Sequence, residues 1–243
     1  MPELPEVEIT TQNLQQIIKP PRRVAKFIFF RKDLRNKFPI RKIMQLQGME
    51  IKKIYRRAKF IIFEFDRGNL LSHLGMTGSW RLEKSETLEW RRKHDHIAIV
   101  LADDVKKNIS DQVLVYSDAR RFGEFDFKSD EELQKRFKAF GAEPLADKTD
   151  WLTVTQNFKK LTCQIKVALM NQKNLVGVGN IYACEALFRA SVRPQRACNK
   201  VTLNEYNALW SEVQKVLREA IAVGGLSIQD FRNGYGGKGE FQK

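Results

Sequence analysis

The first three residues could place a nucleophile beside an acid. The chain begins MPELPEVE, and removal of Met1 in front of the small residue Pro2 would leave a secondary amine at the N-terminus. An α-amino group titrates near ~8, well below the ~10.4 of a lysine, so part of it is uncharged at neutral pH. Such an amine can attack an electrophilic sugar carbon and form an iminium ion, with Glu3 as general acid. A purely structural interpretation stays open, because Pro and Glu both stabilise a first helical turn.

Three further stretches carry cationic or imidazole side chains in unusual places. In RRAKF, Lys59 enters an apolar strand and could hold a phosphate or act as an acid; the alternative is a lysine that protects a sheet edge. In HLGMTG, His73 and Met76 share a glycine-bounded turn, where a methionine is not ordinary core filler. In HDH, His94 and His96 lie on the same side of a strand, but no third metal ligand is evident.

Two glycine-containing stretches could contact nucleic acid. In DARRFG, Arg120 could read a base edge or clamp a phosphate and Phe122 could wedge into a base stack, while a solvated turn with a packed Phe is the alternative. In VGVGN, Gly177 and Gly179 permit close backbone approach, and Asn180 opens a helix whose N-terminus attracts phosphate. The incomplete GxGxxG pattern lacks a βαβ context, so a dinucleotide-binding fold is not supported.

The elements that must position these residues divide the chain into two halves. Residues 4–18 predict a helix, and short β-rich runs follow at 24–30, 51–55, 58–65, 70–76, 96–101 and 113–118. After a capping box at 129–132 the pattern is helical, with helices expected at 151–170, at 180–190 and from TLNE to Gly224-Gly225. We therefore expect an α+β protein with a β-sandwich domain in 1–138, a linker in 139–150 and a helical domain in 151–243.

Composition points to a polyanionic partner. The chain has 243 residues, and 43 basic against 29 acidic residues give a net charge of +14. An excess of this size favours nucleic acid; an anionic membrane surface is less supported, since no basic amphipathic helix is evident. No apolar run reaches the ~18 residues of a membrane helix. The acidic start excludes a signal peptide, and the cysteines, Cys163, Cys184 and Cys198, fit reduced structural thiols inside a cell.

Taken together and in order, the motifs resemble those of bacterial formamidopyrimidine-DNA glycosylases. The stretches concerned are MPELPEVE, RRAK, HLGM, KHDH, DARRFG, GAEPL, IKVALMNQ, VGVGNIYACE and GGLSIQDF, from Met1 to Gln242. The resemblance implies an N-terminal β-sandwich and a helical domain with a helix–two-turn–helix, and a cleft for duplex DNA between them. It also implies excision of oxidised purines, chiefly 8-oxoguanine and formamidopyrimidines, followed by strand cleavage through β,δ-elimination.

The resemblance also implies residue roles. Pro2 matches the nucleophile that attacks C1′, Glu3 the general acid, and Lys59 the lysine essential for the lyase step. Six positions match residues that contact DNA: His73, His94, Asn180, Met76, Arg120 and Phe122. Of these, Met76, Arg120 and Phe122 match the trio that fills the gap left by a flipped base. The positions that match the damaged-base pocket are Glu6, Lys166, Glu185 and Ser227, the last within a loop at 224–236.

The implied partner is double-stranded DNA that contains an oxidised purine, bound by a monomer in the bacterial cytoplasm near the nucleoid. No cofactor is needed for the chemistry. The family's structural zinc needs four cysteines that this chain does not contain, so that zinc finger lies beyond residue 243, was removed, or is missing from this member. Two alternatives stay open: a non-catalytic protein that recognises abasic or distorted DNA, and an endonuclease VIII-like glycosylase for oxidised pyrimidines.

Overall fold

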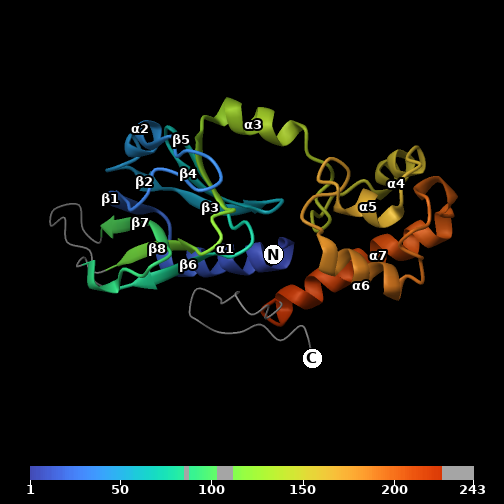
Figure 1. Ribbon diagram of the computed structural model, residues 1–243. Coiled ribbons are helices and arrows are strands. Elements are labelled where there is room, and N and C mark those ends of the chain that lie inside the picture. The colour runs from blue at the N-terminus through green and yellow to red at the C-terminus, as the bar shows by residue number, and fades with distance from the viewer. Residues whose placement is uncertain (85–87, 103–111, 226–243) are drawn as a thin grey trace.

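The protein has a β-rich part and a helical part that lie side by side (Figure 1). The computed structural model describes residues 1–84, 88–102 and 112–225. Among these residues, no helix is long and apolar enough to cross a membrane.

The β-rich part consists of two antiparallel sheets. One has the strand order β2-β1-β7-β8-β6, formed by Glu50–Ile51, Arg22–Phe29, Asp95–Ala102, Val113–Asp118 and Gly78–Glu83. The other has the order β3-β4-β5-β9, formed by Lys53–Arg57, Phe60–Phe65, Gly68–His73 and Glu124–Lys128. Side chains of both sheets, such as Phe63 and Ile99, belong to one buried core. The predicted sandwich is therefore confirmed.

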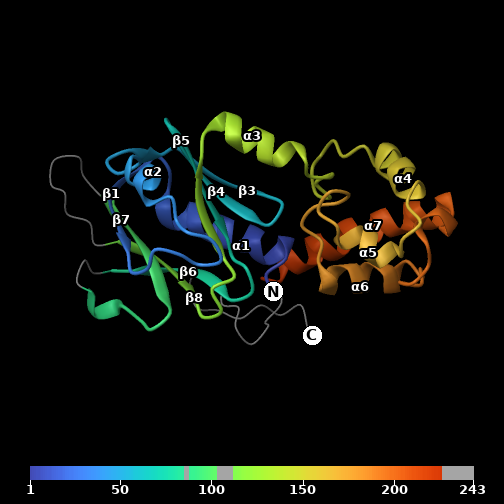
Figure 2. The same ribbon diagram turned by 45° about the horizontal axis from the view of Figure 1, so that its top comes forward.

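Two helices pack on the sandwich: one covers the sheet β3-β4-β5-β9, and the other contributes to the core between the sheets. Helix α3 (Asp130–Lys138) starts at the predicted capping box, in which Ser129 and Glu132 bond each other's backbone N–H groups. It lies across this sheet (Figure 2), where Leu133 packs on Phe60 and Leu71. The short helix α2 (Ile40–Met44) adds the buried side chain of Ile43 to the main core.

Helix α1 (Leu4–Ile18) connects the two parts. Its apolar side chains recur at helical spacing, and Val7, Leu14 and Ile18 are buried in the sandwich core. Leu4, at the start of the same helix, is instead buried in the core of the helical part. The first turn of the chain is therefore held by both domains at once.

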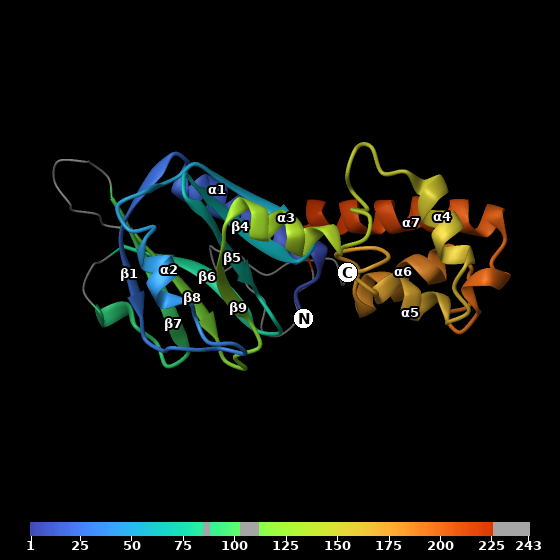
Figure 3. The same ribbon diagram turned by 90° about the horizontal axis from the view of Figure 1, so that it is seen from above.

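The helical part contains α4 (Trp151–Lys159), α5 (Ile165–Met170), α6 (Asn180–Arg189) and α7 (Leu203–Ala222). Figure 3 shows α6 running beside the long helix α7. The apolar face of α7 includes Trp210, whose ring stacks on Trp151 at 5.1 Å between centroids. A short 3-10 turn at Cys198–Lys200 leads into α7.

Two predicted elements are wrong in their extent. The helix expected at 151–170 breaks at 160–164, because this segment pairs with the backbone of 196–198: the N–H of Ile165 donates to the Arg196 carbonyl at 2.8 Å. The strand expected at 51–55 divides into β2 and β3, which belong to different sheets. In both places, pairing with a distant segment overrides the local pattern.

Candidate active site

The N-terminal residues lie buried at the junction of the two domains. Pro2 is buried and Glu3 is 1% exposed. The N–H of Leu4 donates to the Gly177 carbonyl at 3.0 Å, which fixes the start of α1 on the loop before α6. Gly177 has φ +82°, and a Cβ there would lie 2.5 Å from the Leu4 side chain. The glycine is therefore needed both for its backbone conformation and for this contact.

The Glu3 carboxylate caps the N-terminus of α6. It accepts the N–H of Gly179 at 2.7 Å and that of Ile181 at 3.0 Å, where the helix end carries partial positive charge. A Cβ at Gly179 would lie 2.4 Å from the Glu3 carboxyl carbon. This helix end thus receives a carboxylate of the chain itself, whereas the sequence predicted a phosphate. Asn180, between the two donors, has an exposed side chain.

Glu3 faces Lys59, and burial shifts both groups toward their uncharged forms. Burial raises the pKa of Glu3 above 4.5, although the positive charge of Lys59 acts in the opposite direction. Burial lowers the pKa of Lys59 below 10.5, although Glu3 and Glu6 oppose this. Lys59 lies in the turn between β3 and β4 and is 7% exposed, so the interpretation as a lysine protecting a sheet edge is wrong. A carboxyl with a raised pKa beside an amine with a lowered pKa suits acid–base chemistry.

Glu6 and Tyr182 complete this buried group. The N–H of Glu3 donates to Glu6 Oε2 at 2.8 Å, and the Tyr182 hydroxyl donates to Glu6 Oε1 at 2.6 Å. Burial, and then the negative charge of Glu6, raise the pKa of Tyr182 far above its ordinary value, so the hydroxyl stays a donor. The sequence analysis missed Tyr182, although its place in the first turn of α6, within VGVGNIYACE, was an available signal.

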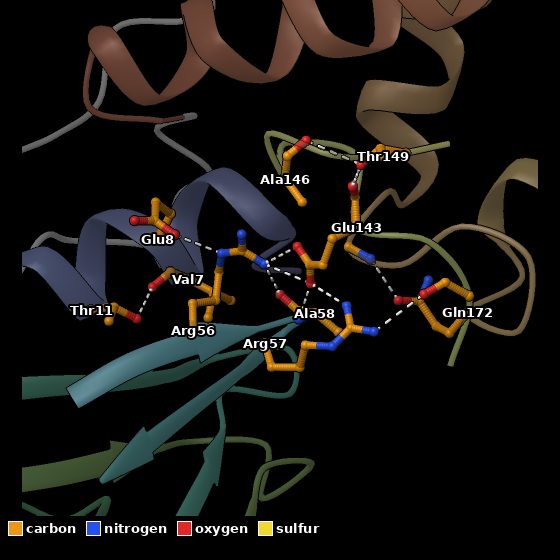
Figure 4. A network of polar contacts seen from close by, with 12 residues as sticks. Val7, Glu8, Thr11, Arg56, Arg57, Ala58, Glu143, Ala146, Thr149 and Gln172 are labelled. Atoms are coloured by element: carbon orange, nitrogen blue, oxygen red, sulfur yellow. Dashed lines mark hydrogen bonds and ion pairs between the residues drawn. The ribbon is translucent and has the colours of Figure 1, made fainter. Parts of the chain in front are cut away.

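A cluster of ion pairs around Glu143 holds the turn that carries the buried lysine; we call Glu8, Arg56, Arg57 and Glu143 the Glu143 cluster (Figure 4). Arg56 bridges Glu8 at 2.6 Å and Glu143 at 2.9 Å, and Arg57 contacts Glu143 at 2.8 Å. Glu143 comes from the linker, Glu8 from α1 and the arginines from β3. The cluster therefore joins α1 and the sandwich to the linker, which pairs with the helical part through the bridge between Ala142 and Leu175. The sequence analysis did not find this cluster.

The same cluster fixes a strained residue next to the lysine. Ala58 has φ 54°, a conformation that residues with a Cβ rarely adopt. Its N–H donates to Glu143 Oε1 at 2.5 Å, and its carbonyl accepts from Arg56 Nη1 at 3.0 Å. These bonds hold the backbone next to Lys59, whose charge acts on Glu3.

Two neighbouring loops carry Met76, Arg120 and Phe122. Phe122 is 48% exposed, and the Arg120 guanidinium lies 5.0 Å from the centre of its ring. A Cβ at Gly75 would lie 2.4 Å from the Phe122 backbone, so the loops touch directly. The interpretation of Phe122 as a packed residue is wrong, because half of its surface meets solvent. An exposed aromatic ring beside an arginine is typical of side chains that enter a base stack.

The histidines take separate roles. His73 Nδ1 accepts the N–H of Gly75 at 3.0 Å, and burial lowers the pKa of His73 to about 4. His94 is exposed, while His96 is buried with Nε2 2.7 Å from the Asp118 carbonyl oxygen. The described residues contain no group of three or more His, Cys, Asp or Glu side chains that could hold a metal ion. Within the HDH motif, His96 is therefore a packed strand residue, whereas His94 is open to solvent.

The remaining predicted pocket residues are not drawn into the buried group. Glu185 pairs with Arg189 on its own helix at 2.7 Å, and Arg189 also contacts Glu219 on α7 at 2.6 Å. Lys166 is half-buried in the first turn of α5. Ser227 and the loop after Gly225 lie outside the described residues. The structure therefore gathers Pro2, Glu3, Glu6 and Lys59, and it leaves the roles of Glu185, Lys166 and Ser227 as predictions.

Comparisons with known proteins identify the family of the chain. The formamidopyrimidine-DNA glycosylase N-terminal domain matches residues 1–125, and the formamidopyrimidine-DNA glycosylase H2TH domain matches residues 140–232. The chain belongs to the formamidopyrimidine-DNA glycosylase family. The predicted fold and the predicted class of activity, a bifunctional DNA glycosylase and lyase, are confirmed by this membership.

Relatives match along almost the whole chain. The formamidopyrimidine-DNA glycosylase of Bdellovibrio bacteriovorus is 40% identical over 242 residues, which cover 100% of this chain and 86% of the relative. That of Hahella chejuensis is 37% identical, with the same coverage. A solved structure of MutM with carbocyclic 8-oxo-G containing DNA has a TM-score of 0.86 and 30% identity, covering 99% of this chain and 85% of that one. The Lactococcus lactis protein bound to FAPY-dG containing DNA gives a TM-score of 0.85 at 30% identity.

Proposed function

We propose that this member of the family removes 8-oxoguanine and formamidopyrimidine bases from duplex DNA and then cleaves the strand, with Pro2 as nucleophile. The observation that carries the proposal is the buried group of Pro2, Glu3 and Lys59 at the junction of the domains. Relatives whose structures were solved with 8-oxo-G and FAPY-dG containing DNA support the substrate class.

Recognition begins with eversion of the damaged nucleotide, because a base inside a duplex cannot be reached. Met76, Arg120 and Phe122 enter the space that the base leaves, which offsets an unstacking cost of a few kcal/mol. His73 and Asn180 hold the phosphates beside the lesion. Such contacts carry no sequence information, which suits an enzyme that finds one lesion in any sequence. The net charge of +14 supplies salt-sensitive association with DNA of any sequence.

Excision follows from the chemistry of the N-terminus. After removal of Met1, the Pro2 nitrogen attacks C1′, and the bond between C1′ and the base breaks as the base leaves with a proton. Glu3, whose pKa is raised by burial, protonates the sugar ring oxygen as the ring opens, which leaves an iminium ion between Pro2 and C1′.

Strand cleavage uses the same iminium ion as an electron sink. Loss of a proton from C2′ expels the 3′ phosphate, and a second elimination expels the 5′ phosphate. Lys59, held beside Glu3 with a lowered pKa, serves these proton transfers and contacts a phosphate. Glu6, Lys166, Glu185 and Ser227 are the proposed surroundings of the everted base.

The working protein is proposed to be a monomer bound to duplex DNA in the bacterial cytoplasm, at the nucleoid. The chemistry needs no cofactor. The chain has three cysteines, so its own residues do not fit the four-cysteine zinc site of the family, and no step above passes through a metal. The chain spans 86% of the length of its relatives.

Borohydride trapping tests the proposal. The protein is incubated with a duplex that carries one 8-oxoguanine opposite cytosine, and borohydride reduces any iminium ion to a stable adduct. We expect a crosslinked band that mass spectrometry maps to Pro2, a protein mass that lacks Met1, and loss of the band with Pro2→Gly. Binding of the duplex without a crosslink, in protein whose mass confirms removal of Met1, would favour a non-catalytic protein. Faster release of oxidised pyrimidines than of 8-oxoguanine would favour an endonuclease VIII-like enzyme.

A further inference from the structure

The buried carboxylate of Asp118 lies beneath the two loops that carry Met76, Arg120 and Phe122. Asp118 is the last residue of β8 and is 0% exposed. It pairs with Gly78 at the start of β6, so it lies where both loops leave the sheet. Asp118 is also the first residue of the motif DARRFG, which carries Arg120 and Phe122.

Each oxygen of this carboxylate holds a different part of the loops. Oδ2 accepts the N–H of Gly123 at 2.8 Å, at the far end of the loop that presents Arg120. Oδ1 accepts the hydroxyl of Thr77, which lies next to Met76. The carboxylate therefore bonds groups from both loops.

A second set of bonds connects the loops directly. The N–H of Arg120 donates to Thr77 Oγ1 at 3.0 Å, and it also faces Asp118 Oδ1 at 3.3 Å. The space around this network is full. A Cβ at Gly123 would lie 1.9 Å from the Tyr116 hydroxyl oxygen and 3.0 Å from Asp118 Oδ2. The loops thus have little freedom to move apart while the network is intact.

We propose that Asp118, acting through Thr77, is a positioning residue that fixes the Met76 loop against the Arg120–Phe122 loop so that all three side chains enter the base stack as one unit. The inference rests on the proposed function, since it needs the trio to fill the gap left by an everted base. Asp118 itself does not touch DNA. It orders the two loops before DNA binds, so the free energy needed to order them is not added to the free energy needed to evert the base.

This role predicts a defect that depends on the state of the duplex. Asp118→Asn keeps the size of the side chain but presents an NH₂ group to one of its donors. Thr77→Val removes the hydroxyl that bridges the loops, and Thr77→Ser retains it. We expect Asp118→Asn and Thr77→Val to slow single-turnover excision of 8-oxoguanine from a fully paired duplex by about 10-fold, the effect of one lost charge-assisted hydrogen bond. Thr77→Ser should stay within about 2-fold of the unchanged protein.

The decisive measurement repeats the assay with the lesion inside a short unpaired bubble, where the stacking cost has already been met. Excision by Asp118→Asn and Thr77→Val should then return to within about 3-fold of the unchanged protein. Asp95→Asn is the matched control, because Asp95 is also buried in this sheet but bonds Arg81 instead of the loops. Asp95→Asn should lower the stability of the protein and leave unchanged the ratio of the excision rate on the paired duplex to that on the bubble.

The outcomes separate the two proposals. If the unchanged protein does not excise 8-oxoguanine from either duplex, the proposed function fails and this inference fails with it. If the unchanged protein is active but the variants lose equal activity on both duplexes, or lose none, only the positioning role is refuted. Should Asp118→Asn not fold, the Thr77→Val and Thr77→Ser pair gives the same decision, since Thr77 is only partly buried.

Discussion

Replacing Glu143 with alanine should loosen the contact between the two domains. The carboxylate accepts from Arg56, Arg57 and the N–H of Ala58, and its loss leaves Arg57 without this partner while Arg56 keeps Glu8. The side chains of Glu143, Arg56 and Arg57 are 15%, 9% and 26% exposed. The ion pairs are therefore largely shielded from water but not fully buried.

The magnitude follows from this burial. Removing one partner of a buried ion pair costs about 3–5 kcal/mol, and partial exposure together with the remaining Glu8 contact places Glu143→Ala at the lower end. For a chain of this size, each kcal/mol lowers the melting midpoint by roughly 2–4 °C. We therefore expect a drop of about 6–12 °C, measured by thermal unfolding at neutral pH.

A matched control removes an exposed ion pair. Glu50 contacts Arg23 at 3.4 Å, and their side chains are 43% and 38% exposed. Such a pair contributes about 0–1 kcal/mol, so Glu50→Ala should shift the midpoint by less than about 4 °C. If Glu143→Ala lowers the melting midpoint no more than Glu50→Ala does, the Glu143 cluster does not hold the domains together, and the reasoning is refuted.

Two further predictions concern the buried carboxyl of Glu3. Because burial raises the pKa of Glu3, the stability linked to its protonated form is complete below pH 4.5 and is lost as the pH rises through the higher pKa of the folded state. The melting midpoint of Glu3→Gln minus that of the unchanged protein should therefore grow as the pH rises over this window. A constant difference between about pH 4 and pH 8 would contradict this expectation. Gly179→Ala places a Cβ 2.4 Å from the Glu3 carboxyl carbon and should slow excision about 100-fold by displacing the acid. The control is Gly48→Ala, whose Cβ meets no atom within 4 Å, and it should lower stability and leave the excision rate unchanged. Equal excision rates in the two variants would refute this prediction.

Much of the architecture was predictable because its signals are local. Hydrophobic spacing located α1, and the capping box at Ser129 located the start of α3. The errors arose where a distant segment decides the outcome. The break before Ile165 depends on a backbone hydrogen bond to Arg196, and no pattern within residues 151–170 predicts that partner.

The sequence pointed to residues that the structure buries at the domain junction, and it missed the residues that support them. Pro2, Glu3 and Lys59 were predicted because their chemistry and motifs are unusual, and their catalytic roles stay predictions. Tyr182, Glu143 and Asp118 act through hydrogen bonds to other side chains, and their types are ordinary in a sequence. Only the fold brings Tyr182 to Glu6, across 176 residues of chain.

The docking of the first helical turn on α6 has a consequence for biosynthesis. Ribosomes release the chain from its N-terminus, so Pro2 and Glu3 emerge long before Gly177, Gly179 and Ile181 exist to receive them. During that interval the N-terminus is open to an aminopeptidase, and the proposed mechanism requires such an enzyme to remove Met1. Once α6 has formed and docked, Pro2 is buried. The order of synthesis thus gives the proposed removal of Met1 time to occur before the two domains assemble around Pro2.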